Sequence, residues 1–295
     1  MFKDLKGFAQ FISIERGFMV LMISVGASFL MNESLVWFDA VFLGVIAFCI
    51  WSAADAMNNI FDVDLDVLSD RSRAEFTKKL GRLGLFIAMF FTALSLVLGV
   101  VTMTPYVVLF IAVGIMFGVV YSVPPFRLRK TAYKPVVNST VGAVPVLIVA
   151  AFFNAFTINI TVLVLLVGVT TAVNSLWEDL ADYASDATSG SRTIPVILGY
   201  KRGLIFTITM GYALIPLMIL VGSLFQLGWI YYLTLTLLSS FVTFRVIQKR
   251  NTLLENGDKK QLFKLGEVLA KDFVIIAITF TLSLMLSSLL KIVAF

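Results

Sequence analysis

Two groups of acidic residues, each at the end of a long apolar run, are the part of this sequence best suited to chemistry. They lie in the segments 58–73, NNIFDVDLDVLSDRSR, and 174–195, NSLWEDLADYASDATSGSRTIP. Residues four positions apart in a helix point in directions only about 40° apart. Each segment therefore places acidic or amide side chains along one helix face. The first acidic stripe is Asn58, Asp62 and Asp66, and the second acidic stripe is Asn174, Glu178, Asp182 and Asp186.

Carboxylates packed this closely repel one another unless a cation lies between them. Clusters of oxygen ligands favour hard ions, and Mg²⁺ is typically bound by a few carboxylates together with substrate phosphates. Basic residues beside the stripes would complete a site for a diphosphate; they are Arg71, Arg73, Lys78 and Arg192. The chain contains no His, which excludes histidine-bound zinc, histidine-ligated haem and imidazole acid–base catalysis.

The composition places these stripes in a membrane protein. Apolar residues make up 59% of the 295 and charged residues 14%, whereas soluble domains have roughly 45–50% and about 25%. Lipid requires a backbone that satisfies its own hydrogen bonds, so we expect an all-α, polytopic protein with one domain, 1–295. The nine predicted spans are 12–31, 36–57, 83–103, 105–122, 136–153, 158–177, 203–223, 227–245 and 271–293.

The basic residues indicate the orientation. With the N-terminus inside, all of the 23 Lys and Arg residues except Lys291 fall in inner segments or at their helix ends. Basic residues favour the cytoplasmic side, so we expect a multi-pass protein of the cell membrane whose N-terminus and active site are cytoplasmic. This distribution also accounts for the net charge of +5 without a nucleic-acid partner.

The two stripes also indicate an internal repeat. Asp62 and Asp182 are 120 residues, or four spans, apart. Repeats of this kind place sites at their interface. We therefore expect two related four-helix halves plus a last helix, with the stripes facing each other across a central cavity.

The motifs resemble those of the UbiA superfamily of intramembrane prenyltransferases. The family pattern NDxxDxxxD is similar to Asn58-Asn59-x-x-Asp62-x-x-x-Asp66, and DxxxDxxxG is similar to Asp182-x-x-x-Asp186-x-x-x-Gly190. The stretch YSVPPFRLRK, 121–130, is similar to the loop that follows the family's fourth span, and SRTIPVILG, 191–199, resembles the stretch after its second motif.

The resemblance implies about nine helices around a central cavity and Mg²⁺ ions bridging an isoprenyl diphosphate. The implied catalytic residues are Asp62, Asp66, Asp182 and Asp186, and the implied metal ligands are these four with Asn58. The expected substrate-binding residues are Asn58, Asn59, Arg71, Arg73, Lys78, Tyr121, Arg127, Lys130, Arg192 and Arg16. The expected partners are an isoprenyl diphosphate, membrane lipid and a lipophilic or aromatic acceptor.

Departures from the family pattern bear on the acceptor. Asn59 replaces an Asp, Asp64 adds a carboxylate, Ala74 follows Arg73 in place of Pro, and Arg16-Gly17-Phe18-Met19 stands where the family has Arg-Pro-x-Asn. The loop 121–130 favours a lipid-like acceptor such as a prenylated glycerol phosphate over an aromatic acid. One alternative function is a cation-coupled transporter that uses the stripes as an ion site. A second is a CDP-alcohol phosphotransferase, although the Asp-Gly...Ala-Arg element of such enzymes is absent. A third is an inactive relative that serves as a structural subunit.

Overall fold

The computed structural model describes residues 2–32, 34–63, 67, 71–254 and 259–293, and every regular element in these ranges is a helix. The long helices are α2 (Ile14–Leu30), α3 (Trp37–Phe61), α6 (Arg82–Val101), α7 (Pro105–Ser122), α8 (Lys134–Phe152), α9 (Ile158–Ala181), α12 (Tyr200–Leu224), α13 (Trp229–Leu254) and α14 (Lys259–Val293). The shorter ones are α1 (Phe2–Phe11), α5 (Arg71–Leu80), the 3₁₀ turn η1 (Leu128–Lys130), α10 (Tyr183–Thr188) and α11 (Ile194–Leu198).

Long apolar helices of this kind are the expected response of the chain to lipid, because a helix satisfies its own backbone. Among the described residues, eight helices are long and apolar enough to span a membrane. The bent pair formed by α1 and α2, which meet at 54°, is a ninth candidate. Each of the nine predicted spans overlaps one long helix. The expected all-α, polytopic fold is therefore confirmed.

The spanning helices differ in how much of their apolar surface the protein covers. In the most apolar 18-residue stretch of each helix, 56% of α3 and 67% of α8 is buried inside the protein. The corresponding shares are only 22% in α6 and 11% in α13. Apolar side chains that neighbouring helices leave uncovered suit a lipid environment. Thus α3 and α8 form the centre of the bundle, and α6 and α13 face outward.

The packing order of the helices repeats. In the first half α2 packs on α3, α3 on α6 and α6 on α7; in the second half α8 packs on α9, α9 on α12 and α12 on α13. Contacts of α8 with α2 and α7 join the halves, and α14 packs against α2, α9 and α13. The structure thus has the expected two four-helix halves and a last helix.

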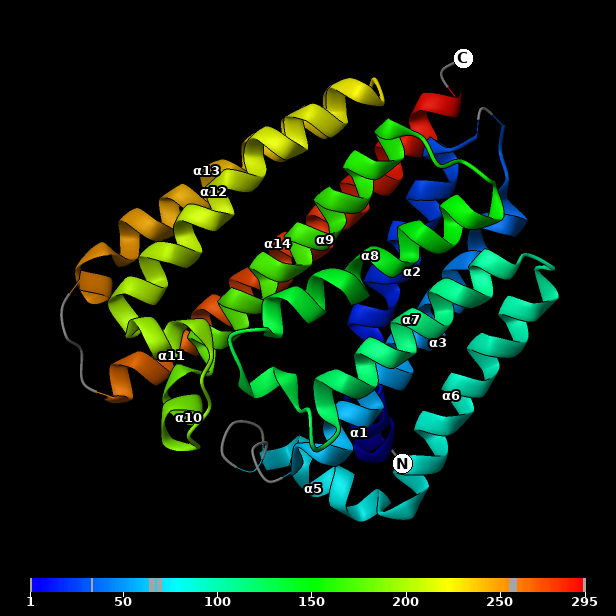
Figure 1. Ribbon diagram of the computed structural model, residues 1–295. Helices are drawn as coiled ribbons and strands as arrows, with labels where there is room; N and C mark the ends of the chain where they lie inside the picture. The colour runs from blue at the N-terminus through cyan, green and yellow to red at the C-terminus, as the bar shows by residue number, and fades with distance from the viewer. Residues whose placement is uncertain (1, 33, 64–66, 68–70, 255–258, 294–295) are drawn as a thin grey trace.

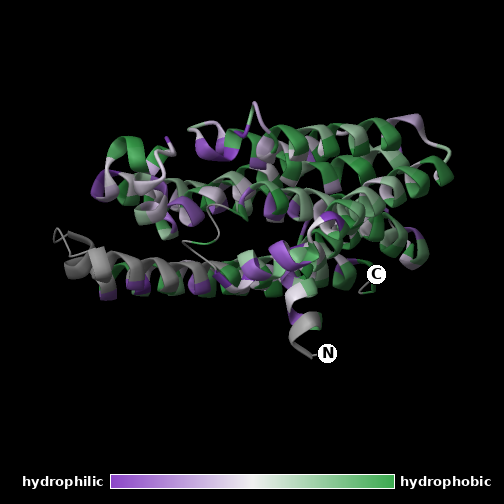
Figure 2. Cartoon of the chain, turned by 90° about the horizontal axis from the view of Figure 1, so that it is seen from below, coloured by the Kyte–Doolittle hydropathy of each residue, from purple (hydrophilic) through white to green (hydrophobic). Residues whose placement is uncertain are grey.

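The short helices α5, α10 and α11 lie at the end of the bundle that carries the N-terminus, and the C-terminus lies at the opposite end (Figure 1). These short helices belong to the connections that follow α3 and α9, where the two acidic stripes end. Apolar residues dominate the long helices, and hydrophilic positions gather in shorter stretches (Figure 2). The fold therefore brings both acidic stripes to one end of the molecule.

Candidate active site

The first acidic stripe lies where α3 ends, and its central carboxylate is held by two arginines. The Asp62 side chain is fully buried. Arg127 donates to Asp62 Oδ1 from Nη2 at 2.8 Å and from Nε at 3.1 Å, and Arg129 Nη1 lies 2.5 Å from Oδ2. Arg129 Nη1 also donates to Asn58 Oδ1 at 3.0 Å. Two guanidinium groups therefore contact this buried carboxylate.

These arginines come from the connection after α7, which folds back over the end of α3. Arg127 has a left-handed backbone conformation, with φ 43°, immediately before η1. Its Nη2 also donates to the carbonyl of Phe61, at 2.5 Å. That carbonyl belongs to the last turn of α3, where the helix leaves carbonyl groups without helical partners. The segment YSVPPFRLRK thus caps α3 and places cations on its acidic stripe.

The second acidic stripe begins inside α9, where basic residues of two other helices hold its inner members. Arg16 of α2 pairs with Glu178 at 2.8 Å. Lys134, the first residue of α8, lies 2.5 Å from Asp179 and 3.7 Å from Glu178, and both Lys134 and Asp179 are buried. The start of each half, α2 and α8, therefore supplies a cation to the end of α9.

The outer members of the second stripe, Asp182 and Asp186, follow the end of α9 and are half-buried. Burial raises the pKa of the Asp182 carboxyl, against the opposing effect of Lys134. Burial also raises the pKa of Asp186, and the Asp182 charge adds to that rise. Thr193 Oγ1 donates to Asp186 Oδ2 at 3.3 Å. A cation bound between these carboxylates would favour their charged forms.

Arg129 connects the two stripes electrostatically. The positive charge of Arg129 opposes the rise in pKa at both Asp182 and Asp186, and that of Arg73 does so at Asp182. Arg129 also pairs with Asp62. The fold therefore brings the ends of α3 and α9 to one site, as the repeat predicts.

The acidic residues fit a hard cation only together with an anionic substrate. Within the described ranges, no three acidic side chains come close enough to hold a metal ion by themselves. Asp66, a predicted ligand, lies outside the described residues, as do Asp64 and Asp70. Mg²⁺ commonly takes one or two carboxylates, with substrate phosphates as further ligands. Asp182 and Asp186 beside the arginines fit that arrangement.

Other predicted substrate-binding residues lie at different distances from this centre. Arg71 pairs with Glu75 on the exposed face of α5, and Lys78 is exposed on the same helix. Arg192 has an exposed side chain, and its backbone N–H donates to the Lys130 carbonyl at 2.7 Å. This bond ties the connection before α11 to η1.

Asn59 has a packing role in the structure. Its side chain is buried, and its Nδ2 donates to the carbonyl of Phe11 at 2.7 Å. Phe11 ends α1, so the bond holds the junction of α1 and α2 against α3. The residue that replaces an Asp of the family pattern therefore makes a packing contact, and its contact with substrate stays a prediction.

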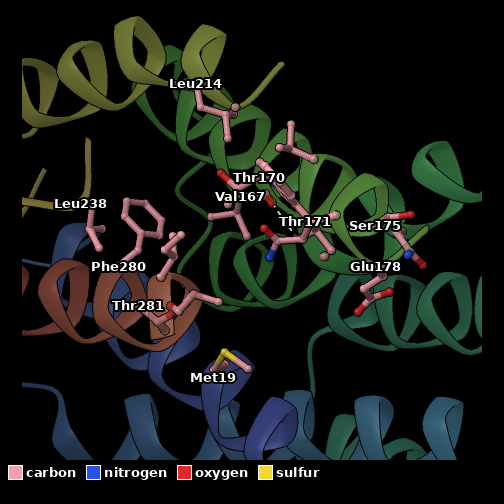
Figure 3. Close-up of a pocket in the computed structure, with 18 of the residues that line it drawn as sticks. Met19, Val167, Thr170, Thr171, Ser175, Glu178, Leu214, Leu238, Phe280 and Thr281 are labelled. Atoms are coloured by element: carbon pink, nitrogen blue, oxygen red, sulfur yellow. Dashed lines mark hydrogen bonds between the residues drawn. The ribbon is translucent and has the colours of Figure 1, made fainter. Parts of the chain in front are cut away.

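An apolar cavity of about 240 Å³ begins beside the acidic stripes and extends between the helices. Val167, Leu214, Leu238 and Phe280 project into it from α9, α12, α13 and α14 (Figure 3). Arg16, Tyr121 and Glu178 line it near the helix ends that carry the stripes, and Asp55 lines it further along α3. A polar entrance thus leads to a chamber suited to a hydrocarbon chain.

Several residues of the site do not appear among the sequence-based candidates. Arg129 belongs to the same basic segment as Arg127 and Lys130, so its place in that segment is a usable signal. Lys134 and its partner Asp179 are buried, and no local pattern indicates their pairing. The cavity also contains an ion pair between Arg245 and Asp272, which joins α13 to α14 at 2.6 Å.

Together, these features define an all-helical membrane protein with an acidic and arginine-rich site at the entrance to an apolar chamber. The sequence model of the UbiA prenyltransferase family matches residues 19–265. The chain belongs to this family, which confirms the resemblance seen in its motifs.

Solved structures share this fold. A digeranylgeranylglyceryl phosphate synthase is similar over 98% of this chain and 99% of its own, with a TM-score of 0.64 and 18% identity. A UbiA homologue from Archaeoglobus fulgidus, solved with geranyl diphosphate (GPP) and Mg²⁺, covers 93% of this chain and 99% of its own, with a TM-score of 0.66 and 16% identity. The apo structure of a UbiA homologue from Aeropyrum pernix K1 covers 92% of this chain and 98% of its own, with a TM-score of 0.71 and 18% identity. No curated protein sequence matches the chain.

Proposed function

We propose that this protein transfers an isoprenyl group from an isoprenyl diphosphate to a lipophilic acceptor within the membrane, and that the reaction requires Mg²⁺. The observation that carries the proposal is the convergence of an arginine-held acid and a second acidic pair at the entrance to an apolar cavity. Acidic residues beside cations suit a metal–diphosphate complex, and the cavity suits the hydrocarbon tail. A homologue from Archaeoglobus fulgidus was solved with GPP and Mg²⁺.

The proposed ligands of the metal ion are Asn58, Asp62, Asp66, Asp182 and Asp186. Bound Mg²⁺ would stabilise negative charge on the leaving diphosphate by Lewis-acid catalysis. Arg127, Arg129 and Arg73 would bind the remaining diphosphate oxygens. A diphosphate offers Arg127 and Arg129 a second anionic partner, so they need not hold both oxygens of Asp62. Lys130, Arg192, Arg71 and Lys78 would add positive charge at the periphery.

The cavity's role is to hold the allylic chain away from water while its bond to the diphosphate breaks. A water-excluding site prevents hydrolysis of a reactive intermediate. Tyr121, which lines the entrance, would face the developing positive charge with its ring. Arg16, paired with Glu178, would contact the polar part of a substrate at the same entrance.

We propose a lipid-like acceptor, such as a prenylglyceryl phosphate, in preference to a small aromatic acid. The cavity walls are largely apolar beyond the entrance, so they favour an acceptor with a long hydrocarbon portion. The similar digeranylgeranylglyceryl phosphate synthase also favours this class. A cation-coupled transporter remains the alternative, but its acidic residues would not need arginines as phosphate partners.

The test is a transfer assay with purified protein in lipid nanodiscs. Isoprenyl diphosphates of increasing length are offered with Mg²⁺ and either a prenylglyceryl phosphate or 4-hydroxybenzoate, and products are identified by mass spectrometry. We expect a prenylated lipid that is absent after chelation of Mg²⁺. Turnover with 4-hydroxybenzoate alone would reverse the acceptor assignment, and no transfer to any acceptor would reject the function.

The proposed orientation is tested by cysteine labelling. We expect the N-terminus and the site to be cytoplasmic in a cell-membrane protein. In a Cys49→Ala background, Phe126→Cys should react with a membrane-impermeant maleimide only from the cytoplasmic side, and Ser34→Cys only from the outside. Both positions are exposed. The reverse labelling pattern would invert the charge argument.

A further inference from the structure

Three acidic residues line the cavity in the described part of the chain: Asp55, Glu178 and Asp272. Two of them have arginine partners, because Glu178 pairs with Arg16 at 2.8 Å and Asp272 accepts two hydrogen bonds from Arg245 at 2.8 and 2.6 Å. Asp55 differs in its direct contact: its Oδ2 accepts a hydrogen bond from the neutral indole N–H of Trp51 at 2.8 Å, and Arg16, which pairs with Glu178, acts on it as a neighbouring charge. A carboxylate held by a neutral donor is a better proton acceptor than one held by a guanidinium group.

The position of Asp55 matches the place where an acceptor must react. Asp55 lies in α3, seven residues before Asp62, which caps the end of that helix, so it lies on nearly the same helix face and about 10 Å further along the axis. The proposed diphosphate site is at the Asp62 end. Asp55 lies beside the cavity, deeper than the diphosphate, where the allylic carbon and its nucleophile would meet.

The neighbourhood of Asp55 combines polar groups with an apolar chamber. Asp55 interacts electrostatically with Arg16 and Glu178, and hydrogen-bonds to Ser13 as well as to Trp51. Tyr121 lines the same cavity from α7. Trp51 lies four residues before Asp55 on one face of α3, so its indole fixes the direction of the carboxylate. A base oriented by a neighbouring side chain is the arrangement that activates a hydroxyl nucleophile.

We infer that Asp55 is the general base of the transfer reaction, and that the acceptor presents a hydroxyl group to it. This inference rests on the proposed function. The allylic carbon–oxygen bond of the isoprenyl diphosphate breaks, and the diphosphate leaves with the electron pair. The acceptor oxygen bonds to the allylic carbon, and its proton passes to the Asp55 carboxylate. The products are an ether, diphosphate and one proton, which Asp55 releases to solvent through the entrance.

Trp51 is a positioning residue in this scheme, since it acts through Asp55. The competing explanation is that Asp55 only balances the charge of Arg16. These two roles differ in what they require of the acceptor. A base is needed only where the acceptor must lose a proton during the reaction, whereas a charge-balancing residue affects every acceptor equally.

The experiment compares Asp55→Asn with the parent, using geranyl diphosphate and two acceptors, a prenylglyceryl phosphate and its thiol analogue. Thiols ionise near pH 8.5 without help, so an assay at pH 8.5 supplies a nucleophile that needs no base. We expect Asp55→Asn to lose at least about 100-fold in kcat with the hydroxyl acceptor, the scale of general-base catalysis. With the thiol acceptor we expect it to stay within about threefold of the parent.

Geranyl diphosphate binding, measured by calorimetry with Mg²⁺, should stay within about threefold of the parent in this variant. Trp51→Phe removes the indole N–H but keeps an aromatic ring, and should lower kcat for the hydroxyl acceptor only, with KM unchanged. It also provides the test if Asp55→Asn does not fold.

Equal losses with both acceptors would overturn the assignment, as would unchanged turnover of the hydroxyl acceptor by either variant. A parent enzyme that alkylates carbon and not oxygen would overturn the hydroxyl class. A parent that transfers to nothing would instead reject the proposed function, so the two failures are distinguishable.

Discussion

The ends of α3 and α9 occupy corresponding places in the two halves, but their acidic residues are balanced in different ways. At the end of α3, Arg127 and Arg129 hold the buried Asp62. At the end of α9, burial raises the pKa values of Asp182 and Asp186, and their mutual repulsion adds to the effect at Asp186. The first site carries its own counter-ions, whereas the second is suited to an added cation.

The two halves also differ at the residues that directly follow Asn58 and Glu178 in the sequence. Asn59 and Asp179, separated by the same 120 positions as Asp62 and Asp182, are both buried. Asn59 donates to the carbonyl of Phe11, just before α2, whereas Asp179 pairs with Lys134 at the start of α8. Both residues tie the second helix of a half to the start of the first. The repeat thus preserves the contact and changes its chemistry from a neutral hydrogen bond to an ion pair.

The largest expected effect is that of Asp62→Asn, which should reduce both transfer and stability. The substitution removes the negative charge that both guanidinium groups contact. Removing one partner of a buried ion pair costs about 3–5 kcal/mol, and the side chains of Arg127 and Arg129, exposed to 22% and 16%, reduce this to roughly 2–3 kcal/mol. Thermal unfolding and the transfer assay measure the two losses. An unchanged Tm would contradict the arginine-held description of this carboxylate.

Asp182→Asn should reduce transfer without reducing stability. We expect at least about a 100-fold loss of kcat, because an electrostatic group acting on the leaving diphosphate is removed. In the presence of a chelator the Tm should equal or exceed that of the parent, since a neutral amide avoids the cost of a buried charge. A Tm as low as that of Asp62→Asn would show that the two ends do not differ as described.

The stability of the parent should depend on Mg²⁺ more strongly at pH 7 than at pH 5. Because the folded-state pKa values of Asp182 and Asp186 are raised, these groups favour folding below their unfolded pKa near 4. That contribution is lost as the pH rises through the folded values. Mg²⁺ binds the ionised carboxylates, so saturating ion should raise stability by about 1–3 kcal/mol at pH 7.

The matched control for this experiment is Asp186→Asn, which removes one of the two carboxylates. Thermal scans with and without Mg²⁺ should show a smaller gain in this variant than in the parent at pH 7. An equal gain at both pH values in the parent would place the metal ion elsewhere.

The fold could be predicted from the sequence largely because hydropathy and length determine the spans. The predicted span 36–57 corresponds to α3, which continues to Phe61. The predicted spans 227–245 and 271–293 are parts of longer helices, since α13 reaches Leu254 and α14 begins at Lys259. Charged residues end a span in lipid, but they do not end a helix, so hydropathy misses these extensions.

The sequence indicated which segments would form the site, but not which side chains would pair with one another. Spacing in the sequence located both stripes and the basic segment at 127–130. It did not show that Arg127 and Arg129 would hold Asp62, because contacts between residues so far apart in the sequence depend on how α7 and α3 pack. Nor did it show that Asn59 would donate to the Phe11 carbonyl, because that contact depends on how α1 packs against α3.

The last prediction compares the two equivalent contacts by substitution to alanine. Asp179→Ala leaves the Lys134 ammonium group buried, with Glu178 3.7 Å away as the remaining anion, and should cost about 2–3 kcal/mol. Asn59→Ala leaves only a buried carbonyl group, that of Phe11, without its donor and should cost about 1–2 kcal/mol. Chemical denaturation of each variant in the same detergent measures the difference. If Asn59→Ala lowers the free energy of unfolding by more than Asp179→Ala does, the neutral contact is the stronger of the two. The ion pair of the second half would then serve catalysis, and Asp179→Ala should show the larger loss of kcat.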